Sequence, residues 1–155
     1  MSRSVAKANR PDRFVLDSFA LLAWLRDEPG ADTVQELLEK ADQKRAKLLV
    51  SWMNIAEIYY ITKRRSKDPD PQLVADRVVE LLQNLPIRIE SISKLEAVGA
   101  ARLKADYSMS LADAFAAALA KTNDARLVTG DPEFEPLDAK KEVSILWLPA
   151  KSKRG

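Results

Sequence analysis

Short apolar segments with the character of buried strands alternate along this chain with segments of helical periodicity. The strand-like segments are residues 13–17 (RFVLD), 46–51 (AKLLVS), 87–91 (IRIES), 125–130 (ARLVTG) and 143–148 (VSILWL). Helical segments long enough to serve as crossover connections lie between most of them. This alternation predicts an α/β fold in which α-helices flank a central, mostly parallel β-sheet.

The predicted helices follow from apolar positions at helical spacing and from the residues that end them. Pro29 and Gly30 follow the first helix, and Pro86 ends the fourth. The expected helices cover residues 18–27, 31–44, 52–65, 72–85, 93–106 and 110–120. We expect one domain over residues 13–148, with a flexible basic extension over residues 1–12 and a basic tail over residues 149–155.

The composition is that of a soluble globular protein, with 46% apolar and 31% charged residues. The longest apolar runs, FALLAWL and AFAAALA, are too short to cross a bilayer, and the N-terminal residues lack the apolar core of a signal peptide. We therefore expect a cytoplasmic protein with no membrane contact.

Histidine and cysteine are both absent from the 155 residues. Their absence removes the usual general base, the thiolate nucleophile and the ligands of most zinc sites. Any chemistry must then use carboxylates, hydroxyls, lysines or a hard metal ion.

Two acidic residues in the first half of the chain lie where a parallel sheet would bind a ligand, at or just after the carboxyl end of a strand. Asp17 ends the first strand, where, taken alone, it is better explained as a helix N-cap. Glu57 lies on the helix that follows the second strand, with Asn54 three positions earlier on the same side. An exposed stripe on a half-buried helix is the alternative for Glu57.

Two further acids lie near strands in the second half. Asp113 opens an apolar helix in the sequence SLADAFAAALA, where Ser110 and Asp113 match a capping box. Asp131 follows the fourth strand between Gly130 and Pro132, which is also typical of an Asx turn.

Taken together, the four acids are predicted to converge at one edge of the sheet. Carboxylates that repel one another in a partly buried site have raised pKa values unless a cation neutralises them. Oxygen ligands without histidine or cysteine favour Mg²⁺ or Mn²⁺ over zinc or copper.

Four segments in order, FVLDSFALLAWL, NIAEIYY, SLADAFAAALA and LVTGDPEF, resemble the motifs of the PIN-domain ribonucleases, and the small size resembles the VapC-type toxins of toxin–antitoxin systems. The resemblance implies a PIN-like fold and a Mg²⁺-dependent endoribonuclease in which metal-activated water cleaves structured RNA such as tRNA or rRNA. It also implies a homodimer held by an antitoxin that is a separate chain. The basic extension before the first strand departs from the usual toxin pattern.

The same resemblance assigns the site residue by residue. Asp17 and Asp113 are expected to bind the metal directly, Asp131 directly or through water, and Glu57 to bind it or to orient the attacking water. The supporting polar residues are Ser18, Asn54, Ser110 and Thr129.

The positive charge that an acidic pocket needs in order to hold RNA is expected in the sequence KRRSK, with Lys63, Arg64, Arg65 and Lys67 as candidates for contacts to the RNA backbone. A solvated helix end is the alternative for this stretch. Two other functions remain open. A haloacid-dehalogenase-type phosphohydrolase would need a second aspartate where Phe19 stands, and a non-catalytic scaffold that binds RNA or protein would be marked by lost acids.

Overall fold

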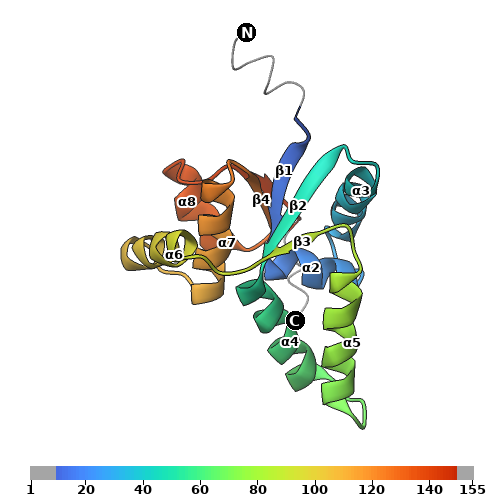
Figure 1. Cartoon of the computed structure of the whole chain (residues 1–155). Coiled ribbons are helices and arrows are strands. Elements are labelled where there is room, and N and C mark those ends of the chain that lie inside the picture. Colours follow the sequence, from blue (N-terminus) through green and yellow to red (C-terminus); the bar gives the residue numbers. More distant parts are fainter. Residues whose placement is uncertain (1–9, 150–155) are drawn as a thin grey trace.

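A computed structural model describes residues 10–149 and shows a five-stranded, wholly parallel sheet (Figure 1). The strands lie in the order β3-β2-β1-β4-β5, and each neighbouring pair is parallel. Their bounds are β1 (Asp12–Leu16), β2 (Ala46–Ser51), β3 (Arg88–Glu90), β4 (Arg126–Thr129) and β5 (Ile145–Trp147). The predicted α/β fold class is confirmed.

Helices cover both faces of the sheet, as the long apolar segments require. They are α2 (Ser18–Leu25), α3 (Ala31–Asp42), α4 (Trp52–Arg65), α5 (Pro71–Gln83), α6 (Lys94–Asp106), α7 (Leu111–Thr122) and α8 (Glu135–Ala139), with a short 3₁₀ helix η1 (Pro132–Phe134). Successive strand residues point to opposite faces. Val15 belongs to a core shared with α6, α7 and α8, whereas Phe14 and Leu16 belong to a core shared with α2, α3, α4 and α5.

Element bounds agree with the sequence-based predictions where a strong signal marks the end. The strand over residues 46–51 and the helix over residues 52–65 have the predicted bounds, and Ser51 caps α4 by accepting a hydrogen bond from the Met53 N–H. β3 and β5 are shorter than predicted, and η1 and α8 were not predicted. These two helices have three and five residues, which is too few for apolar periodicity to reveal them.

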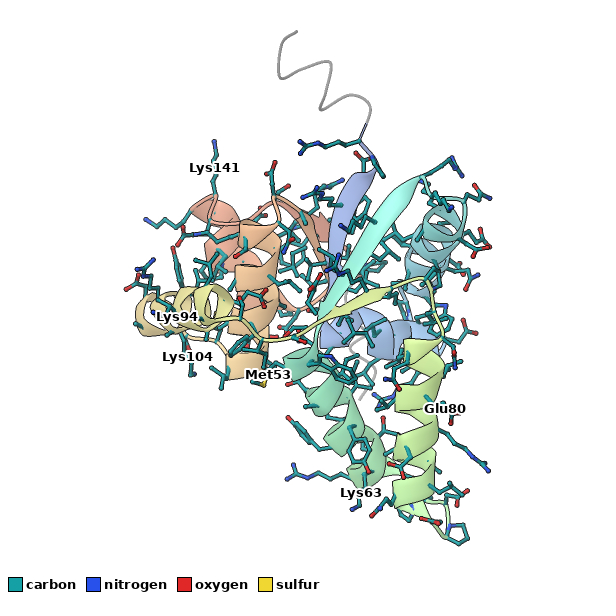
Figure 2. The ribbon with its side chains drawn as sticks, in the orientation of Figure 1. Met53, Lys63, Glu80, Lys94, Lys104 and Lys141 are labelled. Atoms are coloured by element: carbon teal, nitrogen blue, oxygen red, sulfur yellow. The ribbon has the colours of Figure 1, made fainter. Side chains whose placement is uncertain are left out.

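Helices α4 and α5 project from the sheet as an antiparallel arm (Figure 1). Tyr59 of α4 donates a hydrogen bond to Asp76 of α5 at 2.8 Å, which ties the two helices together. Met53 and Lys63 lie toward the two ends of α4 in Figure 2. The arm therefore begins beside the carboxyl edge of the sheet and carries its basic end away from it.

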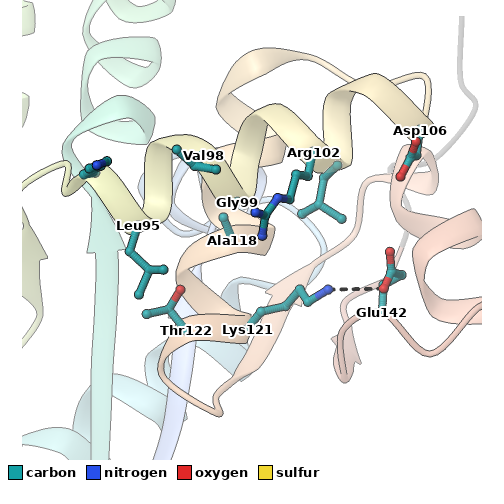
Figure 3. Close-up of a pocket in the computed structure, with 11 residues that line it drawn as sticks. Leu95, Val98, Gly99, Arg102, Asp106, Ala118, Lys121, Thr122 and Glu142 are labelled. Atoms are coloured by element: carbon teal, nitrogen blue, oxygen red, sulfur yellow. Dashed lines mark hydrogen bonds and ion pairs between the residues drawn. The ribbon is translucent and has the colours of Figure 1, made fainter.

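Helix α6 packs closely on α7, with Gly99 facing Ala118. Beside this pair lies a hollow of about 850 Å³ lined by Leu95, Val98 and other residues, with the ion pair between Lys121 and Glu142 at its edge (Figure 3). None of the four predicted site acids lines this hollow.

No helix among residues 10–149 combines the length and the apolar composition that a membrane-spanning helix needs. Residues 1–9 and 150–155, which hold most of the predicted basic extension and basic tail, lie outside the described part of the chain.

Candidate active site

Asp17 is buried at the junction of β1 and α2, with only 1% of its surface exposed. One carboxylate oxygen, Oδ1, accepts a hydrogen bond from the Ala20 N–H at 2.8 Å and caps α2. The other, Oδ2, accepts a hydrogen bond from the Thr129 hydroxyl at 2.5 Å. Asp17 therefore caps α2, the alternative role predicted for it, and also contacts Thr129 at the end of β4.

Thr129 and Asp131 continue this network from β4 into η1. The Thr129 hydroxyl oxygen accepts a hydrogen bond from the Asp131 N–H at 3.0 Å. The Asp131 carboxylate in turn accepts one from the Glu133 N–H at 2.9 Å, so the turn expected at Asp131 is the N-cap of η1. The ends of β1 and β4 are thus joined through side chains at the same edge of the sheet.

Asp113 lies in the first turn of α7 and is 7% exposed. Ser110 caps the helix by accepting a hydrogen bond from the Asp113 N–H at 3.1 Å. The reciprocal bond of a capping box, from the Ser110 N–H to the Asp113 carboxylate, is not among the hydrogen bonds of residues 10–149. The carboxylate is instead directed at other acids.

The Asp113 carboxylate lies beside those of Asp131 and Glu133. One oxygen of each can be chosen so that all three lie within 4.8 Å of one another, close enough to share a metal ion. Glu133 was not predicted. The signal for it is the Asp-Pro pair at 131–132, because a capping aspartate followed by proline begins a helix and brings the residue two positions after the cap back beside it.

Glu57 is the last of the four predicted acids and approaches the others from α4. It is half-buried, and its charge contributes to raising the pKa of both Asp17 and Asp113. The structure therefore brings the four predicted acids within electrostatic reach of one another and adds Glu133 as a fifth. These five residues are called the acidic group below: Asp17, Glu57, Asp113, Asp131 and Glu133.

The amide of Asn54 connects three of the helices around this group. Its Nδ2 donates hydrogen bonds to the Ser18 hydroxyl at 3.1 Å and to the Ala112 carbonyl at 3.3 Å. The Ser18 hydroxyl donates to the main-chain carbonyl of Asn54 at 3.3 Å. All four predicted supporting residues, Ser18, Asn54, Ser110 and Thr129, therefore lie beside the acids or in contact with them.

Burial and mutual repulsion raise the pKa of three of these carboxyl groups. Burial raises the pKa of Asp17 to about 7, although the hydrogen bonds from Thr129 and Ala20 oppose this shift. Burial, a hydrogen bond with Glu133 and the nearby charge of Asp131 raise the pKa of Asp113 to about 8. Burial also raises the pKa of Asp131.

No lysine or arginine among the described residues forms an ion pair with any of these five acids. Their negative charge therefore lacks a neighbouring compensating cation in the part of the chain described. Carboxylate oxygens grouped in this way fit a hard divalent cation, which would replace the protons that Asp17, Asp113 and Asp131 otherwise keep because their pKa values are raised.

The predicted basic residues lie apart from the acids. Lys63, Arg64 and Arg65 form the last turn of α4, and the Arg64 guanidinium lies 5.1 Å from the centre of the Tyr60 ring. From Glu57 to Arg65 the helix rises about 12 Å. Lys67 follows the helix and is exposed. This stretch lies at the distal end of the α4–α5 arm, and the length of α4 separates it from the acids.

Solved structures of toxin–antitoxin proteins share this fold. VapBC2 from Rickettsia felis, bound to a DNA fragment from its promoter, gives a TM-score of 0.66 at 14% identity and covers 88% of this chain and 98% of its own. VapC20 from Mycobacterium tuberculosis, described as a sarcin–ricin loop cleaving toxin, gives a TM-score of 0.60 at 16% identity and covers 81% of this chain and 94% of its own.

Sequence comparison leads to the same group of proteins. Ribonuclease VapC42 of Mycobacterium tuberculosis is 29% identical over 126 residues, which are 76% of this chain and 86% of the relative. The family model described as PIN domain matches residues 14–140, a span that holds the four predicted acids and Glu133. This match removes the haloacid-dehalogenase alternative, and it shows that the chain belongs to the PIN-domain family.

Proposed function

We propose that this chain is a metal-dependent endoribonuclease that cleaves structured RNA such as tRNA or rRNA and uses Mg²⁺ or Mn²⁺. The observation that carries the proposal is the convergence of five acids at the carboxyl edge of the sheet, with no ion-pair partner among the described residues and with a raised pKa at Asp17, Asp113 and Asp131. The similarity to proteins named as ribonucleases supports it.

The geometry suggests a role for each acid. Asp113, Asp131 and Glu133 would hold the cation because their oxygens lie within 4.8 Å of one another. Asp17, oriented by Thr129 and the Ala20 N–H, would bind it from the β1 side. Glu57 is less buried than Asp17 and Asp113 and would orient the attacking water. A bound Mg²⁺ supplies Lewis-acid polarisation and an activated water to phosphodiester hydrolysis.

Positive charge must surround such a pocket for RNA to approach it. Lys63, Arg64, Arg65 and Lys67 supply a basic end to the α4–α5 arm. An RNA whose reacting phosphate lies at the acids would contact these residues through a more distant part of its backbone, since α4 separates the two groups.

The proposed biological role is that of the toxin in a toxin–antitoxin pair. The chain would then work in the cytoplasm as a homodimer and be held inactive by an antitoxin, a separate chain. The similarity to VapC-type toxins supports this role over that of a non-catalytic scaffold.

Cleavage of RNA by the purified chain tests the nuclease activity. We expect cleavage of tRNA or of rRNA fragments with Mg²⁺ or Mn²⁺ and no cleavage in excess chelator. We also expect no cleavage by Asp113→Asn, because this variant removes one of the three carboxylates that would hold the cation. Circular dichroism should show that the variant is folded. Undiminished cleavage in excess chelator would contradict the proposed metal dependence.

Expression in a bacterial host tests the toxin role. We expect growth arrest by the wild-type chain, no arrest by Asp113→Asn, and relief when a cognate antitoxin, to be sought among small proteins encoded beside it, is expressed together with it. Normal growth of a host containing abundant, folded wild-type chain would favour the scaffold instead.

A further inference from the structure

Asn54 lies at a junction of three helices beneath the acidic group. Its side chain has no exposed surface. From α4, its Nδ2 donates one hydrogen bond to the Ser18 hydroxyl of α2 and another to the Ala112 carbonyl of α7. A single amide group therefore connects helices that are distant in the sequence.

Each of these hydrogen bonds acts next to an acid of the site. Ser18 directly follows Asp17, and Ala112 directly precedes Asp113. On its own helix, Asn54 lies three residues before Glu57, which places the two on the same side of α4. Movement of this amide would therefore change the separation of Asp17, Glu57 and Asp113.

The orientation of the amide follows from its partners. The Ala112 carbonyl can only accept a hydrogen bond, so the NH₂ group of Asn54 must face it. The amide oxygen, Oδ1, is then buried and has no hydrogen-bond partner within the described residues. The side-chain hydrogen bonds that Asn54 makes within the described residues therefore run from its NH₂ group to α2 and α7.

We propose that Asn54 is a positioning residue for cation binding. It acts by fixing the starts of α2 and α7 relative to α4. This inference rests on the proposed function, because it assumes that the acids bind a divalent cation. Asn54 does not touch the cation in this role. It sets the spacing of the carboxylates that do.

The test is a titration of the wild-type chain and of Asn54→Ala with Mn²⁺ alone, followed by calorimetry. Loss of a residue that orients metal ligands typically weakens binding by about 10- to 100-fold, and we expect a loss in this range. Asn123→Ala is the matched control, because Asn123 also donates from Nδ2 to a carbonyl of α7, that of Leu119, at the opposite end of the helix. We expect this control to bind Mn²⁺ as the wild-type chain does.

Thermal unfolding in chelator separates positioning from a purely structural role. It identifies a temperature at which Asn54→Ala and Asn123→Ala are both folded, and at that temperature we expect Asn54→Ala to lose far more Mn²⁺ affinity than Asn123→Ala. Equal Mn²⁺ affinity of Asn54→Ala and the wild-type chain would overturn the inference. Affinity losses of the same size in both variants would overturn it as well.

A second variant covers the case in which Asn54→Ala does not fold. Ser18→Ala removes one acceptor of the Asn54 amide and keeps the bond to Ala112. We expect weaker Mn²⁺ binding by this variant and overturn the inference if its affinity is unchanged. If the wild-type chain itself binds no Mn²⁺, the proposed metal-dependent function fails too, and this outcome is distinct from wild-type binding with unaffected variants.

Discussion

Two aspartates of this site cap a helix and also belong to the acidic group. Asp17 caps α2 through Oδ1 and contacts Thr129 through Oδ2. Asp131 caps η1 through Oδ1. Because a carboxylate has two oxygens that can each accept hydrogen bonds, a cap does not exclude a metal ligand. The cap instead restricts the rotation of the side chain and fixes the position of the remaining oxygen.

Glu133 provides a prediction at the scale of one side chain. Glu133→Gln should weaken Mn²⁺ binding by at least about tenfold, because it replaces a charged oxygen ligand near Asp113 and Asp131 by a neutral amide. Titration calorimetry measures the change. The control is Glu135→Gln, an exposed residue two positions later that is not part of the cluster. Equal affinities of the two variants would exclude Glu133 from the cation site.

The sequence allowed four of the five acids to be anticipated, since each lies at a recognisable strand end or on the helix that follows. Glu133 was missed because its position depends on the tight 3₁₀ turn that Asp131 and Pro132 begin. The contact from Asn54 to the Ala112 carbonyl could not be anticipated either. It depends on how α4 and α7 pack, which local spacing does not determine.

At the scale of elements, the spacing between α2 and the end of β4 depends on a residue without a side chain. A Cβ atom added at Gly130 would overlap the ring of Phe19, lying 2.7 Å from its Cζ. Phe19 is on α2 next to Ser18, and Gly130 lies between Thr129 and Asp131. The absence of a side chain at Gly130 therefore lets the two segments that carry Asp17 and Asp131 approach closely.

Gly130→Ala should therefore destabilise the fold, by about 1 to 3 kcal/mol, the usual cost of overpacking a core. Urea unfolding measures this loss, and Phe19→Leu in the same chain should recover part of it. Gly99→Ala on α6 is the control, because its Cβ would lie 3.5 Å from that of Ala118, an ordinary contact. Alanine favours helix over glycine by about 1 kcal/mol, so this control should be neutral or stabilising. A Gly130→Ala variant as stable as the wild-type chain would contradict the close approach.

Long elements were easier to predict than short ones for a physical reason. α4 has a serine cap and enough turns to show an apolar stripe, and α7 is buried and apolar on all sides from Ala114 to Ala120. η1 and α8 are stabilised mainly by the burial of Phe134 and Leu137 in the core. That burial depends on the finished sheet and leaves no periodic pattern.

At the scale of the whole molecule, the acidic group makes folding depend on pH. In the folded chain the pKa of Asp17 is raised to about 7 and that of Asp113 to about 8, from an ordinary value of 3.8. At pH values between the ordinary and the raised pKa, the folded chain keeps protons on these two carboxyl groups that the unfolded chain has released. The stability contributed by protonation is complete below about pH 4 and is lost as the pH rises through 7 to 8.

In chelator, the thermal midpoint of the wild-type chain should therefore fall between pH 5 and pH 8. Asp113→Asn should show a smaller fall, because an amide cannot ionise. Mn²⁺ added at pH 8 should restore stability by binding the ionised carboxylates. Scanning calorimetry tests all three expectations. An identical pH dependence of the wild-type chain and Asp113→Asn would show that the Asp113 carboxylate does not ionise as described.

The hydrogen bond between Thr129 and Asp17 joins residues 112 positions apart. β4, which carries Thr129, pairs directly with β1 in the interior of the sheet, so a chain still being translated cannot complete the acidic group until β4 and η1 have left the ribosome. Under the proposed function, the ribosome that makes this protein is thereby protected from it during synthesis. An incomplete product that ends before β4 would lack Asp131 and Glu133, two of the three acids whose oxygens lie within 4.8 Å of one another.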